Sequence, residues 1–305
     1  MIDLNVQSVR VIAKKDFQDA VRSYLFWGMS AFFCLLILLP AVLLWWLEGD
    51  LTAEGATTEG LIALTYNSSQ WILPLIAAVV GWKTIVGERE SGSLNVLLGL
   101  PHSRADVVVG KAIGRGAVLV VSLFVGFGTA ALFVAVLFGG FDVSDYVGLF
   151  LASALYGLAF LSVFIAISTI SRAWTVAVGG VVATWIMFSV GWYGMLPMIE
   201  MLANRGYGSM VTVTLEINGD EIDVERHRSW AYFIHHLSPA ISFPNSLSYM
   251  TSVAELDPDA QEIQDSLFDG SVPFYLRDWF SLVILKFWIL APIAFSVYYF
   301  QRDDL

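Results

Sequence analysis

The sequence predicts an all-α protein that crosses a membrane several times. Of its 305 residues, 57% are hydrophobic and only 14% are charged, which is more apolar than the core of a soluble domain requires. Six runs contain few or no charges, and each is long enough to cross a hydrocarbon core about 30 Å thick as a helix. Because backbone groups in lipid must be paired within the segment or in a closed barrel, such continuous runs favour helices over alternating barrel strands.

The hydrophobic runs divide the chain into four parts. The predicted transmembrane helices are Tyr24–Leu47, Leu61–Val86, Val107–Phe138, Tyr146–Ile170, Ala173–Pro197 and Asp278–Phe300. We therefore expect an interfacial segment at 1–23, five spans within 24–197 with a charged loop at 87–106, an outer domain at 198–277, and the last span with a short tail at 278–305. The first run is too long for a cleaved signal, and nothing indicates that the N-terminus is removed.

The N-terminal segment predicts an amphipathic helix on the membrane surface. Apolar side chains recur at steps of three and four residues, and Lys and Arg take other positions. The apolar set is Ile2, Val6, Val9, Ala13, Phe17, Ala20 and Tyr24. The basic face suits an anionic inner leaflet. Two roles stay open: a simple anchor, or a helix that also contacts a cytoplasmic partner.

The distribution of charge predicts that both termini are cytoplasmic. In this orientation the inner segments carry eleven of the 16 Lys and Arg residues and the outer segments four, while Lys286 lies inside the last span. This bias follows the positive-inside rule, so we expect a multi-pass protein of the cell membrane. Nineteen of the 27 acidic residues fall outside. They suit either attraction of a cationic substrate or, as we favour, a solvated surface in a halophilic source.

The long outer segment predicts a small structured insertion before the last helix. Apolar and polar residues alternate over 211–217 and again after Asn218-Gly219, which is typical of an extracellular β-hairpin with a tight turn. The apolar stretch 230–250 predicts short helices on the outer membrane face. His227, His235 and His236 are weak candidates for metal ligands. Ordinary interfacial histidines are the simpler interpretation, and we expect no metal or cofactor in this chain.

Polar residues inside two predicted spans are candidates for lining a transport pathway. Asn67, Ser68, Ser69 and Gln70 interrupt the second span, and Lys286 lies several turns inside the sixth. Polar groups at this depth are costly unless they face protein or water. The alternatives are that the four-residue cluster marks the outer end of its helix and that Lys286 pairs with a carboxylate to help helices assemble.

Enzyme motifs are missing from the sequence. The nucleotide-binding pattern GxxxxGK[ST] does not occur, because Gly110-Lys111 lacks both the upstream glycine and the following hydroxyl. HExxH and GxSxG are also missing. We therefore expect no catalytic residues in this chain and no nucleic-acid partner.

The loop at 87–106 has the composition of a docking element. It begins with charged residues, continues through glycine, serine and leucines, and ends at a proline. The candidate contact residues are Glu88, Arg89, Glu90, Gly92, Leu94, Leu97, Leu98, Pro101 and Arg104. In a docked helix the leucines would supply affinity and the charges orientation. A loop folded back on its own bundle is the alternative.

The order of residues in this loop resembles the permease subunits of ABC-2 type ATP-binding cassette transporters. It reads E-R-E-x-G-S-L from Glu88, then L-L from Leu97, L-P-x-S-R from Leu100 and G-K from Gly110. The likeness extends to I-A-K-K-D-F at 12–17 and to L-S-P at 237–239. It is strongest to the branch that includes the copper-enzyme maturation permease associated with nitrous oxide reductase.

The resemblance implies a permease subunit that couples ATP hydrolysis in a separate cytoplasmic ATPase to export of a substrate or its extraction from the membrane. It implies two permease subunits, as a homodimer or heterodimer, with two ATPase copies that bind ATP and Mg²⁺. It also implies that the loop at 87–106 holds a coupling helix seated on the ATPase. The competing interpretations are a stand-alone secondary transporter or channel that uses Lys286 and the cluster at 67–70, and a membrane-anchored protein that binds metal through the outer histidines. The sequence does not identify the substrate.

Overall fold

The architecture is that of an all-α membrane protein. The computed structural model describes residues 4–47, 58–94, 99, 103–205, 210–217, 220–252, 267–268 and 272–302. Within these ranges six helical segments are long and apolar enough to cross a membrane: Tyr24–Trp46, Gly60–Ser91, Arg104–Phe138, Val143–Ile170, Trp174–Asn204 and Asp278–Arg302. The number of spans and their places in the chain agree with the prediction.

Eleven α-helices lie in the described part of the chain. They are α1 (Val6–Val21), α2 (Tyr24–Leu47), α3 (Thr58–Gly81), α4 (Val86–Ser91), α6 (Arg104–Phe138), α7 (Val143–Ile170), α8 (Trp174–Ile186), α9 (Met195–Asn204), α10 (Ser229–His236), α11 (Pro239–Met250) and α13 (Asp278–Arg302). A π-helical turn and a 3-10 turn join α8 to α9. The fifth span runs through to Asn204 because Pro197 falls in the first turn of α9, where no backbone N–H is needed.

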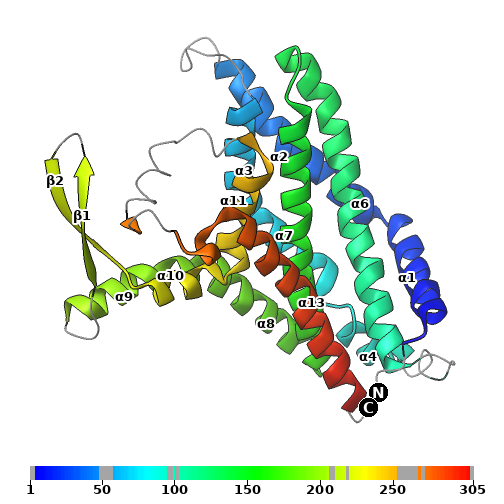
Figure 1. The fold of residues 1–305 in the computed structure, drawn as a ribbon. Helices are drawn as coiled ribbons and strands as arrows, with labels where there is room; N and C mark the ends of the chain where they lie inside the picture. The colour runs from blue at the N-terminus through cyan, green and yellow to red at the C-terminus, as the bar shows by residue number, and fades with distance from the viewer. Residues whose placement is uncertain are drawn as a thin grey trace.

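Two antiparallel strands occupy the segment where apolar and polar residues alternate. β1 (Val211–Ile217) pairs with β2 (Asp220–Arg226) in a register that places Val213 opposite Val224. The pair projects from the side of the bundle beyond α9 (Figure 1). The side of the membrane on which it lies remains a prediction.

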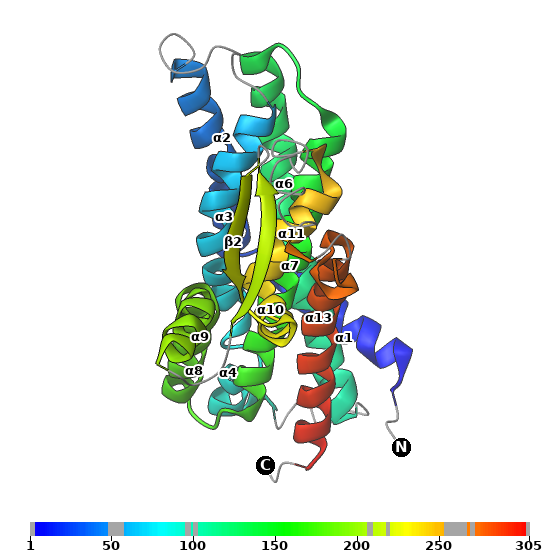
Figure 2. The same cartoon turned by 60° about the vertical axis from the view of Figure 1, so that its left-hand side comes forward.

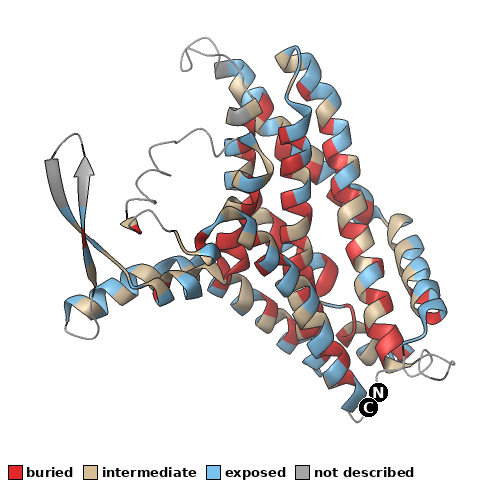
Figure 3. Ribbon diagram, in the orientation of Figure 1, coloured by how far each residue is buried: buried red, intermediate tan, exposed pale blue. Residues whose placement is uncertain are grey.

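Helix α7 is the centre of the bundle. It packs against α3, α6, α11 and α13, and 67% of its most apolar window is buried, compared with 22% for the span that contains α8 and α9. Figure 3 shows this contrast between α7 and the largely exposed α8–α9 arm. Both termini lie at the same end of the bundle as α4 (Figure 1), which we call the termini end.

The sequence predicts that the stretch 230–250 forms short helices on a membrane face. Helix α11, within this stretch, is instead packed against α7 and α13, and much of it is buried. Phe243 stacks on Tyr156 of α7, with ring centroids 4.4 Å apart and planes inclined by 7°. The Tyr156 hydroxyl donates to the backbone carbonyl of Gln70 on α3 at 3.0 Å. Trp288 of α13 donates from Nε1 to the carbonyl of Leu237 at 2.7 Å. These contacts join α3, α7, α11 and α13 into one core.

Helix α1 crosses α6 at very close range, on the side of the bundle opposite α8 and α9 (Figure 1, Figure 2). A Cβ at Gly110 would lie 2.8 Å from the Cβ of Ile12, and one at Gly114 would lie 3.0 Å from the carbonyl oxygen of Ala13. Small residues four apart are a common device for close approach of membrane helices. Ile12 is buried at this crossing, whereas Val6, which we expected on the apolar face, is exposed.

Gly126 brings α6 equally close to α2, and its neighbour Gly128 provides a matched control. A Cβ at Gly126 would lie 2.7 Å from the carbonyl oxygen of Ser30 and 2.9 Å from the amide nitrogen of Cys34, whereas one at Gly128 would meet nothing within 4 Å. Backbone atoms cannot move aside locally, so Gly126→Ala should lower stability by about 1–3 kcal/mol. Gly128→Ala should be neutral or slightly stabilising, because alanine favours a helix. Thermal unfolding of the two variants in detergent measures the difference, and equal midpoints would contradict the close packing.

Candidate functional site

Three consecutive charged residues on α4 contact three different helices of the same chain. Glu88 Oε1 lies 2.6 Å from Lys111 Nζ on α6. Arg89 donates from Nη1 to the carbonyl of Ser171 at 3.2 Å and from Nη2 to that of Thr169 at 3.5 Å, both at the end of α7. Glu90 Oε1 accepts a hydrogen bond from the backbone N–H of Trp174, the first residue of α8, at 2.7 Å.

These contacts satisfy helix ends that have no partners of their own. The last carbonyls of a helix lack intrahelical donors and carry partial negative charge, while the first N–H groups lack acceptors. Arg89 donates hydrogen bonds to carbonyls at the end of α7. Glu90 accepts a hydrogen bond from the first N–H of α8, where Ala173 offers no capping side chain. In addition, the Ser168 hydroxyl of α7 accepts the backbone N–H groups of Ile85 and Val86 at 3.0 and 3.2 Å. The turn before α4 is thereby fixed to α7.

The other flank of the loop is attached in the same way. Arg104 donates from Nη1 to the carbonyl of Phe300 near the end of α13 at 3.2 Å, and its guanidinium lies 5.9 Å from the centre of the Phe300 ring. Ser103 and Asp106 form a capping box at the start of α6. The buried Asp106 carboxylate also accepts the backbone N–H of Asn5 at 2.8 Å. The start of α1 is therefore tied to the start of α6.

An ionic cluster of Asp16, Glu88, Lys111 and Arg115 lies between α1, α4 and α6. Lys111 Nζ stands 3.7 Å from Asp16 Oδ1, in addition to its contact with Glu88. Arg115 Nε stands 3.0 Å from Asp16 Oδ2. The Lys111 side chain is 5% exposed and that of Asp16 11%. Because Gly110 and Gly114 bring α1 against α6, the adjacent basic residues can reach Asp16.

The structure describes the start of the middle part of the loop, through Leu94. Gly92 ends α4 in a left-handed conformation (φ 73°), which favours glycine. Leu94 is buried in a cluster with Ile85, Val108 and Phe300, so its side chain packs within the chain. Leu97, Leu98 and Pro101 lie outside the described residues, and their contact with a partner remains a prediction.

The pathway candidates lie on two different helices, α3 and α13. Asn67 and Ser68 hydrogen-bond to carbonyls of their own helix, those of Ala63 and Leu64, while Ser69 and Gln70 are buried. All four lie in the middle of α3, not at its end. Lys286 is exposed on α13. Helix α7 packs against both α3 and α13, and a role of these residues in transport remains a prediction.

The outer histidines do not gather into a metal centre within the described residues, where no group of three His, Cys, Asp or Glu side chains is placed to hold an ion. The rings of His235 and His236 stand 5.8 Å apart and nearly perpendicular. His236 Nδ1 lies 2.9 Å from the carbonyl of Tyr232. Burial, with smaller contributions from His236 and His227, lowers the pKa of His235 to about 4, so this ring is neutral at neutral pH.

Sequence analysis missed Asp16, Lys111, Arg115 and Ser168 as site residues. A signal for the two basic residues was present, since Gly110-Lys111 and Gly114-Arg115 repeat a glycine–cation pair four residues apart. On a helix this spacing places both glycines on one face and both cations on the next. Ser168 had no such signal, because a serine within an apolar helix also bonds to its own backbone.

The fold is that of a six-span helical membrane protein. At the termini end, charged residues of α4 bond to neighbouring helices of the same chain. The chain belongs to the ABC-2 transporter family, because the family model described as "ABC-2 family transporter protein" matches residues 10–305. This confirms the resemblance found in the sequence.

Two curated relatives are described as probable permeases. The chain is 30% identical over 183 residues to the "Probable ABC transporter permease protein NosY" of Stutzerimonas stutzeri, a match that covers 58% of this chain and 65% of the relative. It is 30% identical over 186 residues to the protein of the same description from Pseudomonas aeruginosa, covering 59% of this chain and 66% of the relative. The chain thus spans slightly less than two thirds of either relative.

The ionic cluster makes a direct prediction for stability. Lys111→Met leaves the Glu88 carboxylate without its cation, and removing one partner of a largely buried ion pair should cost about 3 kcal/mol. Lys14→Met, at an exposed position on α1, is the matched control and should change stability little. Unfolding in detergent compares the two, and adding Glu88→Gln to Lys111→Met should recover part of the loss. Equal stability of the two single variants would contradict the structural role of the cluster.

Proposed function

We propose that this chain is the permease subunit of an ABC-2 transporter that couples ATP hydrolysis by a separate ATPase subunit to export of a substrate or its extraction from the membrane. The complex would contain two permease subunits, identical or different, and two ATPase copies that bind ATP and Mg²⁺. The permease would sit in the cell membrane with both termini in the cytoplasm. The family match over residues 10–305 supports this role.

The attachment of the loop flanks is the observation that carries the coupling proposal. The segment between α4 and α6 is flanked by residues bonded to the end of α7, the start of α8 and the end of α13. Glu88 and Asp106 add bonds to α6 and to the start of α1. A displacement of the segment by an ATPase would therefore move several helix ends together.

The leucines and the charged residues would have different tasks in this mechanism. Leu97 and Leu98 would fill a groove on the ATPase and supply most of the affinity, because apolar anchors dominate such interfaces. Glu88, Arg89, Glu90 and Arg104 would transmit the displacement into the bundle through the bonds described above. Binding and transmission should therefore be separable by mutation.

The binding half of the proposal is tested with Leu97→Asp combined with Leu98→Asp. Two carboxylates in an apolar groove should abolish capture of the partner ATPase in a pull-down while insertion into the membrane is unchanged. Gln18→Asp, exposed on α1, is the control and should leave capture intact. Undiminished capture by the double variant would refute the assignment of these leucines.

The transmission half is tested with Arg89→Gln, which removes the charge that holds the end of α7. The variant should still capture the ATPase, but stimulation of ATP hydrolysis on assembly should fall by about tenfold, the effect of losing on the order of 1.4 kcal/mol of coupling. Arg10→Gln, exposed on α1, is the control. Full stimulation with Arg89→Gln would show that the α4–α7 contact does not transmit.

A further inference from the structure

Two adjoining cavities open beside the ionic cluster. The first has a volume of about 320 Å³ and is lined by residues of α1, the start of α2, the end of α3, α4 and α6. The second, of about 280 Å³, is lined by the end of α3, the following turn, α4 and α6. They share Val80, Glu88 and Arg115. Together they reach the size of sites for small molecules, about 300–1,000 Å³.

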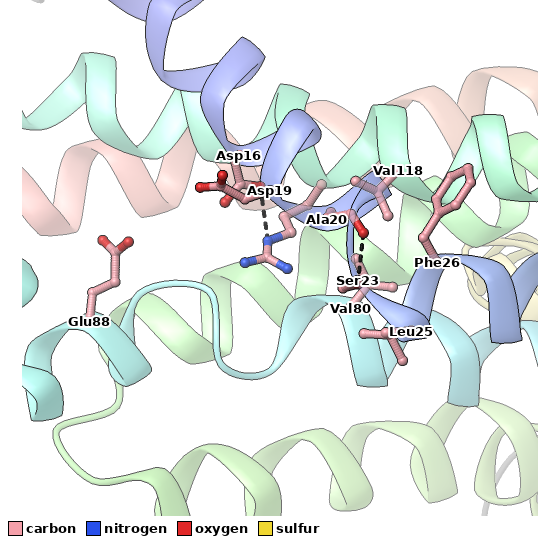
Figure 4. Close-up of a pocket in the computed structure, with 10 residues that line it drawn as sticks. Asp16, Asp19, Ala20, Ser23, Leu25, Phe26, Val80, Glu88 and Val118 are labelled. Atoms are coloured by element: carbon pink, nitrogen blue, oxygen red, sulfur yellow. Dashed lines mark hydrogen bonds and ion pairs between the residues drawn. The ribbon is translucent and has the colours of Figure 1, made fainter.

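The first cavity has a polar end and an apolar end. Figure 4 shows Asp16, Asp19 and Glu88 at one end and Leu25, Phe26 and Val118 at the other. Leu25 and Phe26 belong to the first turn of α2, and Val80 belongs to the last turn of α3. The apolar end therefore lies beside the start of α2, and the polar end is formed by side chains of α1 and α4. This arrangement suits an amphiphile.

The lining carries one acidic and one basic side chain beyond those paired in the ionic cluster. The two carboxylates and two cations of the cluster balance one another. Asp19 in the first cavity and Lys83 in the second are exposed, and neither forms an ion pair within the part of the chain that the structure describes. The carbon chain of Lys83 lies against Gly87, which holds its ammonium close to the second cavity.

One oxygen of the cluster also lacks a partner. Glu88 Oε2 is buried and accepts no hydrogen bond from the described residues, while its other oxygen binds Lys111. Buried polar atoms without a partner are uncommon and mark places where a water or a ligand completes the site. Glu88 lines both cavities, so a cation bound there would lie beside its carboxylate.

We propose that the two adjoining cavities bind the zwitterionic headgroup of a phospholipid from the leaflet at the termini end. Its ammonium would lie beside Asp19 and Glu88, and its phosphate beside Lys83. The acyl chains would pass along Leu25 and Phe26 into the bilayer. The proposal does not depend on which substrate the transporter moves.

The experiment measures lipid binding to the purified full chain in detergent by native mass spectrometry. Wild-type protein should bind phosphatidylethanolamine more tightly than phosphatidylglycerol, which carries the phosphate without the ammonium. Asp19→Asn should weaken phosphatidylethanolamine binding about fivefold, the size of one exposed ionic contact, and should not weaken phosphatidylglycerol binding. Lys83→Gln should weaken the binding of both lipids, because both carry the phosphate.

The controls distinguish a specific headgroup site from non-specific electrostatic attraction of anionic lipids. Lys15→Gln, exposed on α1 and outside both cavities, should leave both affinities unchanged. Soluble phosphoethanolamine should compete with the lipid more strongly than inorganic phosphate does. Equal affinities for the two lipids, or equal competition by phosphate and phosphoethanolamine, would overturn the proposal and indicate a simple anion site.

Discussion

The structure depends on the need to satisfy polar helix ends at the termini end of the bundle. A helix that stops at a membrane surface leaves backbone groups without partners and a partial charge at its end. Here the charged residues on both sides of one loop supply those partners, with Arg89 at the end of α7, Glu90 at the start of α8 and Arg104 near the end of α13. One short segment thereby fixes the relative positions of helices that are distant in sequence.

A second constraint strengthens the first from the side of α1. Gly110 and Gly114 remove the side chains that would keep α1 away from α6, and the cations that follow each glycine then reach Asp16. Glu88 joins the same cluster from α4. Helices α1, α4 and α6 are thus linked by charge in a partly buried setting, where ionic contacts are stronger than at an open surface. Asp19 and Lys83, which form no ion pair with the described residues, line the two cavities beside this cluster, and they are the basis of the proposed site for a zwitterionic headgroup.

Hydropathy was sufficient to predict the fold class and the six spans, because burial in lipid imposes a length and a composition that one sequence displays. The loop at 87–106 was also recognisable from its composition. The hydrogen-bond partners of its side chains could not be predicted. Arg89 and Glu90 bond to residues 82 and 84 positions away, and Arg104 bonds to a residue 196 positions away. The burial of α11 was not predicted for a similar reason: Phe243 packs against Tyr156 of α7 and Tyr66 of α3, which are distant from it in sequence.

Distance measurement by electron paramagnetic resonance tests the central claim, that the loop flank and the helix ends form one rigid unit. In a Cys34→Ala background, spin labels at Ser91 of α4 and Gln301 of α13, both exposed, report their separation, with labelled protein diluted so that only distances within one chain are read. A rigid unit requires a single narrow distribution that stays unchanged when the partner ATPase and ATP are added, and that broadens when Arg89→Gln and Arg104→Gln are combined. A broad or ATP-dependent distribution in the otherwise wild-type chain would contradict it.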